Sequence, residues 1–157
     1  MSELRIGLGV DAHAFADGVP LVLGGIQFES GRGLAGHSDG DVVTHALIDA
    51  LLGAAGLGDI GSLFPSDAST PEGISSLDLL GDALARVRDA GYSVVNADCV
   101  LIGEQPRIAG RRGEMEAALS AVAGAPVSVR ATTTDRLGFT GRGEGLAAQA
   151  VALVQHA

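Results

Sequence analysis

The chain has 157 residues, of which 46% are hydrophobic and 18% charged, with a formal net charge of −9 and a single cysteine, Cys99. This composition excludes a disordered chain, an internal disulfide and a multi-cysteine zinc finger, and it argues against nucleic-acid partners. Because the sequence has neither an 18-residue apolar run nor a signal-peptide pattern, we expect residues 1–157 to form one cytoplasmic domain that does not bind membranes.

The first part of the chain predicts short strands followed by a helix. Residues 4–11 alternate as a strand does, and residues 20–28 resemble a hairpin. A glycine-rich loop follows over residues 31–40. A helix is predicted over residues 41–55, because the apolar positions share one broad face and Gly56 is a suitable stop.

The rest of the chain predicts alternating helices and strands after a long loop over residues 57–75, a length typical of binding loops and lids. The predicted elements are a helix over 75–91, a strand over 93–103, a helix over 108–123, a strand over 127–133 and a helix over 144–155. This order favours an α+β or α/β two-layer fold, a sheet of about four or five strands with helices packed on one face.

Two separated segments contain residues suited to binding a metal. Asp11 and His13 project from the same face of the first predicted strand, because side chains alternate along a strand. His37 and His45 lie in and just after the glycine-rich loop, at the start of the first helix, where N–H groups and the helix dipole favour phosphate. Asp49, four residues after His45, is positioned to bond its second ring nitrogen.

Asp11, His13 and His45 together supply one carboxylate and two imidazoles. Three protein ligands with an open fourth position are typical of catalytic zinc, and two histidines favour zinc or a similar transition metal over magnesium alone. Each segment taken alone is also compatible with ordinary polar or half-buried residues. A further polar segment, residues 131–145, contains the hydroxyl, carboxylate, arginine and glycine groups of a phosphate and divalent-cation site, or of a flexible turn.

Long motifs in the same order resemble the 2-C-methyl-D-erythritol 2,4-cyclodiphosphate synthases of the non-mevalonate isoprenoid pathway. The matching segments are Arg5–His13, Gly36–Ala46, Asp49–Ala55, Asp59–Pro65 and Thr132–Gly145. The resemblance covers nearly the whole chain. It implies a phosphorus–oxygen lyase in which the 2-phosphate of 4-diphosphocytidyl-2-C-methyl-D-erythritol 2-phosphate attacks the β-phosphate. The products are the cyclic diphosphate and CMP.

The resemblance implies roles for individual residues. Asp11, His13 and His45 correspond to the zinc ligands, the same trio that the residue types suggest. His37 and Thr133 correspond to catalytic positions that stabilise the transition state. The family also uses magnesium or manganese between the substrate phosphates, and the corresponding carboxylate here is Asp135 where the family usually has glutamate.

Two sets of substrate-binding residues are also implied. One set surrounds the methylerythritol and diphosphate: Asp11, His13, His37, Ser38, Asp59, Ile60, Gly61, Phe64, Pro65, Ser66 and Asp67. The other surrounds the cytidine and its phosphates: Gly103, Glu104, Gln105, Pro106, Arg107, Ile108, Ala109, Thr132, Thr133, Thr134 and Asp135. The family forms homotrimers with sheets facing the three-fold axis and sites between subunits, and Phe139 and Arg142 correspond to its cavity for isoprenoid diphosphates.

The sequence is also compatible with two other functions. A zinc-dependent phosphohydrolase would share the metal ligands but needs a general base beside the attacking water, and His37 is the only histidine to spare near them. A non-enzymatic trimer that binds isoprenoid diphosphates through Phe139 and Arg142 would have no need of all three metal ligands. The chain contains no lysine, so Arg107 and Arg130 stand where the family has lysines.

Overall fold

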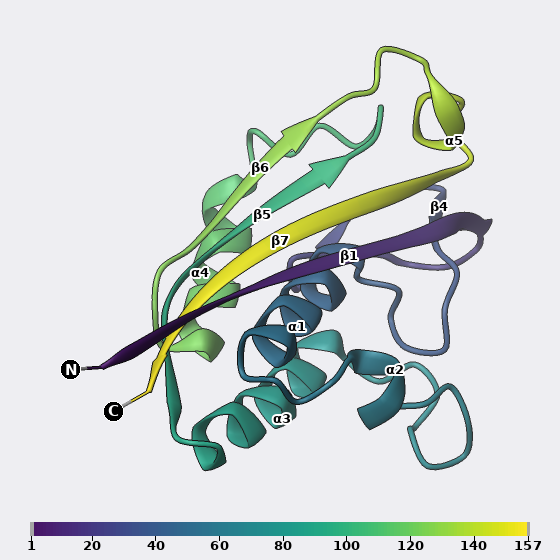
Figure 1. The fold of residues 1–157 in the computed structure, drawn as a ribbon. Coiled ribbons are helices and arrows are strands. Elements are labelled where there is room, and N and C mark those ends of the chain that lie inside the picture. The colour runs from purple at the N-terminus through teal and green to yellow at the C-terminus, as the bar shows by residue number, and fades with distance from the viewer. Residues whose placement is uncertain (1, 157) are drawn as a thin grey trace.

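The computed structural model describes residues 2–156 as two layers, a curved sheet and a set of helices that covers one of its faces (Figure 1). The strands are β1 (Glu3–Asp17), β2 (Leu21–Leu23), β3 (Ile26–Phe28), β4 (Arg32–Leu34), β5 (Tyr92–Ile102), β6 (Val127–Thr132) and β7 (Gly145–His156). The helices are α1 (Val42–Ala54), α2 (Ile60–Leu63), α3 (Ser76–Asp89), α4 (Arg112–Ala123) and α5 (Gly138–Gly141).

The main sheet has five strands in the order β4-β1-β7-β5-β6, and β2 and β3 form a separate hairpin. All neighbouring pairs of the main sheet are antiparallel except β5 and β6, which are parallel and are connected through α4. A parallel pair needs such a crossover, whereas antiparallel strands do not. The prediction of a sheet of about four or five strands with helices on one face is confirmed, with five strands in the main sheet.

Helix α1 lies directly on the sheet because the strand beneath it has no side chains there. A Cβ atom on Gly7 would lie 1.9 Å from the carbonyl oxygen of Ala50, and one on Gly9 would lie 1.8 Å from that of Ala46. The helix is almost wholly buried. This close approach brings His45, one turn into α1, against the residues that follow Gly9 in β1.

Asp41 fixes the start of α1 and ties the β2–β3 hairpin to it. Its buried carboxylate accepts hydrogen bonds from the backbone N–H of Thr44 at 3.0 Å and from the Thr44 hydroxyl at 2.6 Å. It also accepts from the N–H groups of Gly24 and Gly25 at 2.9 and 2.7 Å. Four donors therefore satisfy one buried carboxylate, which anchors the hairpin to the start of α1.

The prediction of a helix over residues 144–155 is wrong, because this segment is β7, the middle strand of the sheet. Its alanines have a high helix propensity, but burial recurs at every second residue, as in a strand. The buried hydrophobic residues on this strand are Leu146, Ala148, Ala150, Ala152 and Val154. Pairing on both sides, with β1 and β5, outweighs the local preference.

Other boundaries also differ from the prediction. The first strand continues to Asp17 because it pairs with β7 and then with β4, which lies in the predicted glycine-rich loop. The long loop after α1 contains the short helix α2. Within residues 2–156, no helix is both long and apolar enough to cross a membrane.

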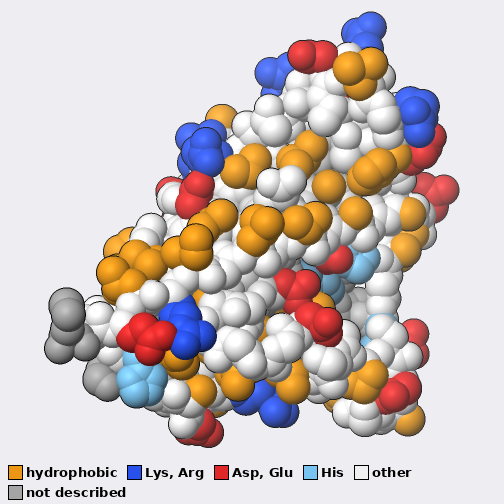
Figure 2. Space-filling view, viewed as in Figure 1, with side chains coloured by type: hydrophobic (Ala, Val, Ile, Leu, Met, Phe, Trp, Pro, Cys, Tyr) orange, Lys and Arg blue, Asp and Glu red, His pale blue; other side chains and the backbone are white. Residues whose placement is uncertain are grey.

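The face of the sheet opposite the helices is apolar and exposed. Leu4, Ile6, Leu8 and Val10 alternate along β1 on this face, and Val151 of β7 pairs with Leu8. Ile6 is 75% and Leu8 is 64% exposed. Figure 2 shows the resulting band of apolar side chains along the strands. A continuous apolar band of this kind is typical of a surface that binds another molecule.

Candidate active site

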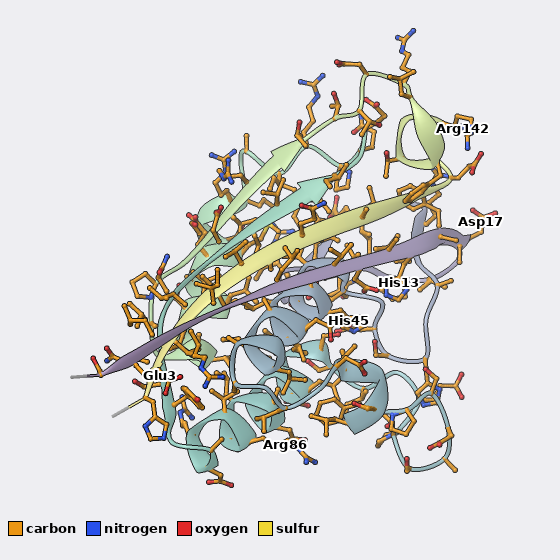
Figure 3. The ribbon with its side chains drawn as sticks, in the orientation of Figure 1. Glu3, His13, Asp17, His45, Arg86 and Arg142 are labelled. Carbon is orange, nitrogen blue, oxygen red and sulfur yellow. The ribbon has the colours of Figure 1, made fainter. Side chains whose placement is uncertain are left out.

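Three side chains from β1 and α1 meet where the helix crosses the strand. Nε2 of His13 lies 2.7 Å from Oδ2 of Asp11, and Nδ1 of His45 lies 3.1 Å from the same oxygen. The two imidazole nitrogens are 3.2 Å apart. Figure 3 shows His13 and His45 between the strand and the helix. We call these three residues the Asp-His-His cluster.

The cluster has the form of a metal site. One oxygen and two nitrogens, one from each residue, lie within 4.8 Å of one another. Burial raises the pKa of Asp11, but the neighbouring imidazoles of His13 and His45 lower it by more, to about 2. The carboxylate is therefore ionised at neutral pH, and a carboxylate with two imidazoles is a donor set that could hold a divalent transition metal.

The outer nitrogens of both imidazoles also have partners. Nδ1 of His13 donates to the carbonyl oxygen of Ala35 at 2.7 Å. Nε2 of His45 lies 3.0 Å from the hydroxyl oxygen of Ser38 and 2.9 Å from that of Ser76. The expected bond from Asp49 to His45 is wrong, because Asp49 instead accepts from the N–H of Ile60 at 2.7 Å.

A cavity of about 170 Å³ opens on the cluster, and we call it the metal-side pocket. It brings together residues that the sequence singles out from three separate segments. Its lining is Asp11, His13, His37, Ser38, His45, Ile60, Gly61, Phe64, Ser66, Thr70 and Leu79. Thr70 and Leu79 were not predicted. Thr70 lies in the long loop already singled out, and its carbonyl oxygen accepts from Nε2 of His37 at 2.5 Å.

Three residues that were predicted to surround the methylerythritol and the diphosphate do not line the metal-side pocket. Asp59 caps α2 by accepting from the N–H of Ser62 at 2.8 Å. Asp67 accepts from the N–H of Ser69 at 2.8 Å and from its hydroxyl at 2.5 Å. Pro65, which lies between these two residues in the sequence, is partly buried. In this conformation the two carboxylates organise the loop.

A larger hollow of about 670 Å³ lies where β5 and β6 end, and we call it the arginine-side pocket. Its lining is Gly103, Glu104, Gln105, Pro106, Arg107, Ala131, Thr132, Thr133, Arg136, Gly141 and Arg142. Ala131, Arg136 and Gly141 were not predicted as ligands, although all three belong to the polar segment 131–145. The three arginines give this pocket positive charge in an acidic chain.

Other predicted residues lie beside the arginine-side pocket and do not line it. Ile108 is buried in the core, whereas Ala109, Asp135 and Phe139 are exposed. The hydroxyl of Thr134 donates to the carbonyl oxygen of Leu137 at 2.8 Å. Asp135 has a left-handed backbone with φ of 50°, and its carboxylate accepts from the Thr133 hydroxyl at 3.2 Å.

The two pockets have no lining residue in common. His37 therefore belongs to the metal-side pocket and Thr133 to the arginine-side pocket, although both were predicted to act on the same reaction. Arg130 belongs to neither lining, and its guanidinium forms an ion pair with Asp98 at 2.7 Å. The Asp-His-His cluster and the arginine-side pocket are therefore separate within one chain.

Comparison with known proteins decides the family. The sequence profile of the YgbB family matches residues 4–155. The chain belongs to the YgbB family. A curated relative of this family, the 2-C-methyl-D-erythritol 2,4-cyclodiphosphate synthase of Rubrobacter xylanophilus, is 54% identical and covers 100% of this chain and 98% of its own. This YgbB chain is thus an enzyme of the isoprenoid synthase family that the sequence motifs resemble.

Solved structures of the family have the same fold. The bifunctional IspDF of Campylobacter jejuni matches with a TM-score of 0.95 and 37% identity, over 100% of this chain and 43% of its own length. This YgbB chain therefore spans less than half of that bifunctional protein. The IspF of Plasmodium falciparum, solved as a CDP complex, matches with a TM-score of 0.84 and 30% identity, over 98% and 96% of the two chains.

Proposed function

We propose that the chain converts 4-diphosphocytidyl-2-C-methyl-D-erythritol 2-phosphate to 2-C-methyl-D-erythritol 2,4-cyclodiphosphate with release of CMP. The observation that carries this proposal is the convergence of Asp11, His13 and His45 at a pocket, in a chain of the YgbB family. The CDP complex of the Plasmodium falciparum relative supports a cytidine diphosphate as the substrate class.

The reaction transfers a phosphoryl group within one molecule. An oxygen of the 2-phosphate attacks the β-phosphorus, a new P–O–P bond forms, and the bond from the β-phosphorus to the oxygen of the CMP phosphate breaks. The electron pair of that bond leaves on CMP, so no oxidant, water or protein nucleophile is consumed. Such a reaction depends mainly on positioning and on charge stabilisation, which suits a pocket of histidines, hydroxyls and arginines.

Asp11, His13 and His45 are the proposed zinc ligands. The ionised carboxylate and the two imidazoles fit this ion, and the outer nitrogens of both histidines are held by hydrogen bonds, as is typical of zinc sites. Bound zinc supplies positive charge that polarises a phosphate oxygen of the substrate. Asp135, beside Thr133, is the residue that would hold magnesium or manganese, which would supply further positive charge to the substrate phosphates.

The remaining pocket residues bind and orient the substrate in this proposal. His37 and Ser38, with the segment Asp59–Asp67, surround the methylerythritol and its diphosphate. Donation from Nε2 of His37 to the Thr70 carbonyl holds that ring at the edge of the metal-side pocket. The segments Gly103–Ala109 and Thr132–Asp135 take the cytidine and its phosphates, where Arg107 replaces the lysine of the family and keeps the positive charge.

Both pockets act on one substrate, so we propose that a neighbouring copy of the chain completes each site. Two observations support this: the two linings share no residue, and the sheet exposes an apolar band that a second copy would bury. A homotrimer with the sheets facing the three-fold axis satisfies both. Phe139 and Arg142 would then lie near the axis, where an isoprenoid diphosphate is a candidate ligand.

Phosphorus NMR of the reaction products tests the proposed function. The protein is incubated with the diphosphocytidyl substrate, zinc and magnesium. We expect the resonances of a cyclic diphosphate together with CMP. Linear, hydrolysed phosphates would support the zinc-dependent phosphohydrolase instead. An unchanged substrate under all metal conditions would contradict both enzymes and would leave the non-enzymatic isoprenoid-binding trimer.

A further inference from the structure

Ser76 holds the side of His45 that faces away from the cluster. Ser76 is the first residue of α3, and its side chain is fully buried. Its hydroxyl oxygen lies 2.9 Å from Nε2 of His45. The other ring nitrogen of His45, Nδ1, faces Asp11 and His13. The environment of Ser76 therefore bears directly on which nitrogen of His45 can bind a metal.

Asp39 determines the direction of the hydrogen bond between Ser76 and His45. Its carboxylate accepts from the hydroxyl of Ser76 through Oδ1, and from the backbone N–H of Ser76 through Oδ2 at 2.9 Å. An ionised carboxylate can only accept, so the single hydroxyl proton of Ser76 is committed to Asp39. Towards His45, the Ser76 oxygen can then only accept. Nε2 of His45 must carry the proton.

The hydroxyl of Ser38, which also lies near His45, does not determine the tautomer of the imidazole. Ser38 lies 3.0 Å from Nε2, but its own proton is not committed to a carboxylate, and its oxygen accepts from the N–H of Gly40 at 3.3 Å. Ser38 is therefore compatible with either tautomer of the imidazole. Asp11, at 3.1 Å from Nδ1, would favour a proton on Nδ1 if nothing opposed it. Ser76, fixed by Asp39, is the group that opposes it.

We infer that Ser76 and Asp39 are positioning residues that keep His45 in the tautomer with the proton on Nε2. Nδ1 then presents its lone pair to the metal site. The Ala35 carbonyl has the equivalent effect on His13, because it accepts from Nδ1 and leaves Nε2 for the metal. The consequence for metal binding rests on the proposed function, whereas the assignment of the tautomer rests on the hydrogen bonds alone.

A role of Ser76 and Asp39 in stabilising helix α3 can be separated from their role in orienting His45. Asp39 also caps α3, because it accepts the N–H of Ser76 while the N-cap residue, Ser75, makes no side-chain cap bond. Substitution S76A keeps that N–H and removes only the hydroxyl. The helix cap therefore survives in S76A, and the contact with His45 does not. S75A is the matched control, since it removes a neighbouring exposed hydroxyl from the same helix end.

Two measurements test the inference without measuring turnover. In the metal-free protein, at a pH where the imidazole is neutral, long-range proton–nitrogen NMR reports the tautomer of His45. We expect the Nε2–H form in the wild type and in S75A, and a substantial Nδ1–H population in S76A. Competition between the zinc-loaded protein and a chelator gives the affinity. We expect S76A to bind zinc about 10- to 100-fold more weakly than S75A.

A second variant, D39N, tests whether the direction of the Ser76 hydrogen bond sets the tautomer of His45, and not merely the presence of the Ser76 hydroxyl. D39N replaces the carboxylate with an amide that can donate to the Ser76 oxygen, so the Ser76 hydroxyl can donate to Nε2 of His45. We expect the Nδ1–H tautomer in D39N although the Ser76 hydroxyl remains. The inference is overturned if S76A keeps the Nε2–H form, even with weaker zinc binding, or if its zinc affinity is within about twofold of that of S75A.

Discussion

Gly9 and Ala46 are in direct backbone contact, and a Cβ at position 9 would lie 1.8 Å from the Ala46 carbonyl oxygen. Ala46 directly follows His45, and His13 lies four residues beyond Gly9 on the same face of β1. The distance between the strand and the helix therefore sets the distance between the two imidazoles. A stretch of strand without side chains is what allows the Asp-His-His cluster to form.

Substitution G9A is expected to destabilise the protein by about 3 kcal/mol or more, because backbone atoms of α1 must move to make room. Zinc affinity should fall with it, since His45 moves away from His13. Urea denaturation and chelator competition measure the two effects. G81A is the control: a Cβ at position 81 of α3 meets nothing within 4 Å, so it should stabilise by about 0.5–1 kcal/mol. Equal effects of the two substitutions would show that the close contact has no special role.

Substitution H45A is expected to reduce turnover to background and to weaken zinc binding, with little change in the thermal unfolding midpoint. It removes one of three candidate ligands that converge within 4.8 Å, while α1 keeps its other buried residues. H156A is the matched control, because His156 packs edge-on against Tyr92 in another part of the sheet, with ring centroids 4.9 Å apart. Full activity of H45A after metal depletion would contradict the assignment of the cluster.

Substitution D41N is expected to cost about 2–3 kcal/mol of unfolding free energy. The buried carboxylate accepts from four donors in α1 and in the β2–β3 hairpin. An amide presents only one oxygen, so some of these donors lose their acceptor. Urea denaturation measures the loss, and D82N, which changes an exposed carboxylate on α3, should alter stability by less than about 0.5 kcal/mol. A loss as small as that of D82N would mean that the carboxylate does not anchor the hairpin.

Substitution D135E is expected to keep the activity or to lower the magnesium concentration that half-saturates it. Glutamate carries the carboxylate one methylene further from the backbone, as the resemblance to the family implies. The residue is exposed and has φ of 50°, a conformation that aspartate tolerates better, so a stability loss below about 1 kcal/mol should accompany the change. A magnesium titration of the initial rate measures the effect. A large loss of rate would show that this loop binds the metal differently from the proposal.

The sequence predicts features set by local periodicity well, and features set by contacts between distant segments poorly. The alternation of Asp11 and His13 and the place of His45 near a helix start were sufficient to propose the trio, because strand and helix periodicity are local properties. The helix expected over residues 144–155 is wrong, because pairing with β1 and β5 outweighs the propensity of an alanine-rich segment.

Hydrogen-bond partners that come from distant segments could not be predicted from the sequence either. The spacing of four residues predicts that Asp49 holds His45, but the hydroxyl of Ser76 lies against its Nε2 instead, from a helix that begins 31 positions later. The separation of His37 from Thr133 into two pockets is likewise a property of the assembled sheet. No spacing along the chain shows which loops at the ends of different strands will meet.

Two variants, H45A and T133A, each altered in one pocket, test whether two chains share one active site. We expect each alone to give almost no cyclic diphosphate by phosphorus NMR. When the two are co-expressed and purified together, random pairing builds about a quarter of the sites from two intact pockets, so roughly a quarter of the wild-type initial rate of cyclic diphosphate and CMP formation should return. Co-assembled variants that make no cyclic diphosphate, while the wild type does, would contradict a site shared between chains. Release of hydrolysed phosphates by the wild type would contradict the cyclisation itself.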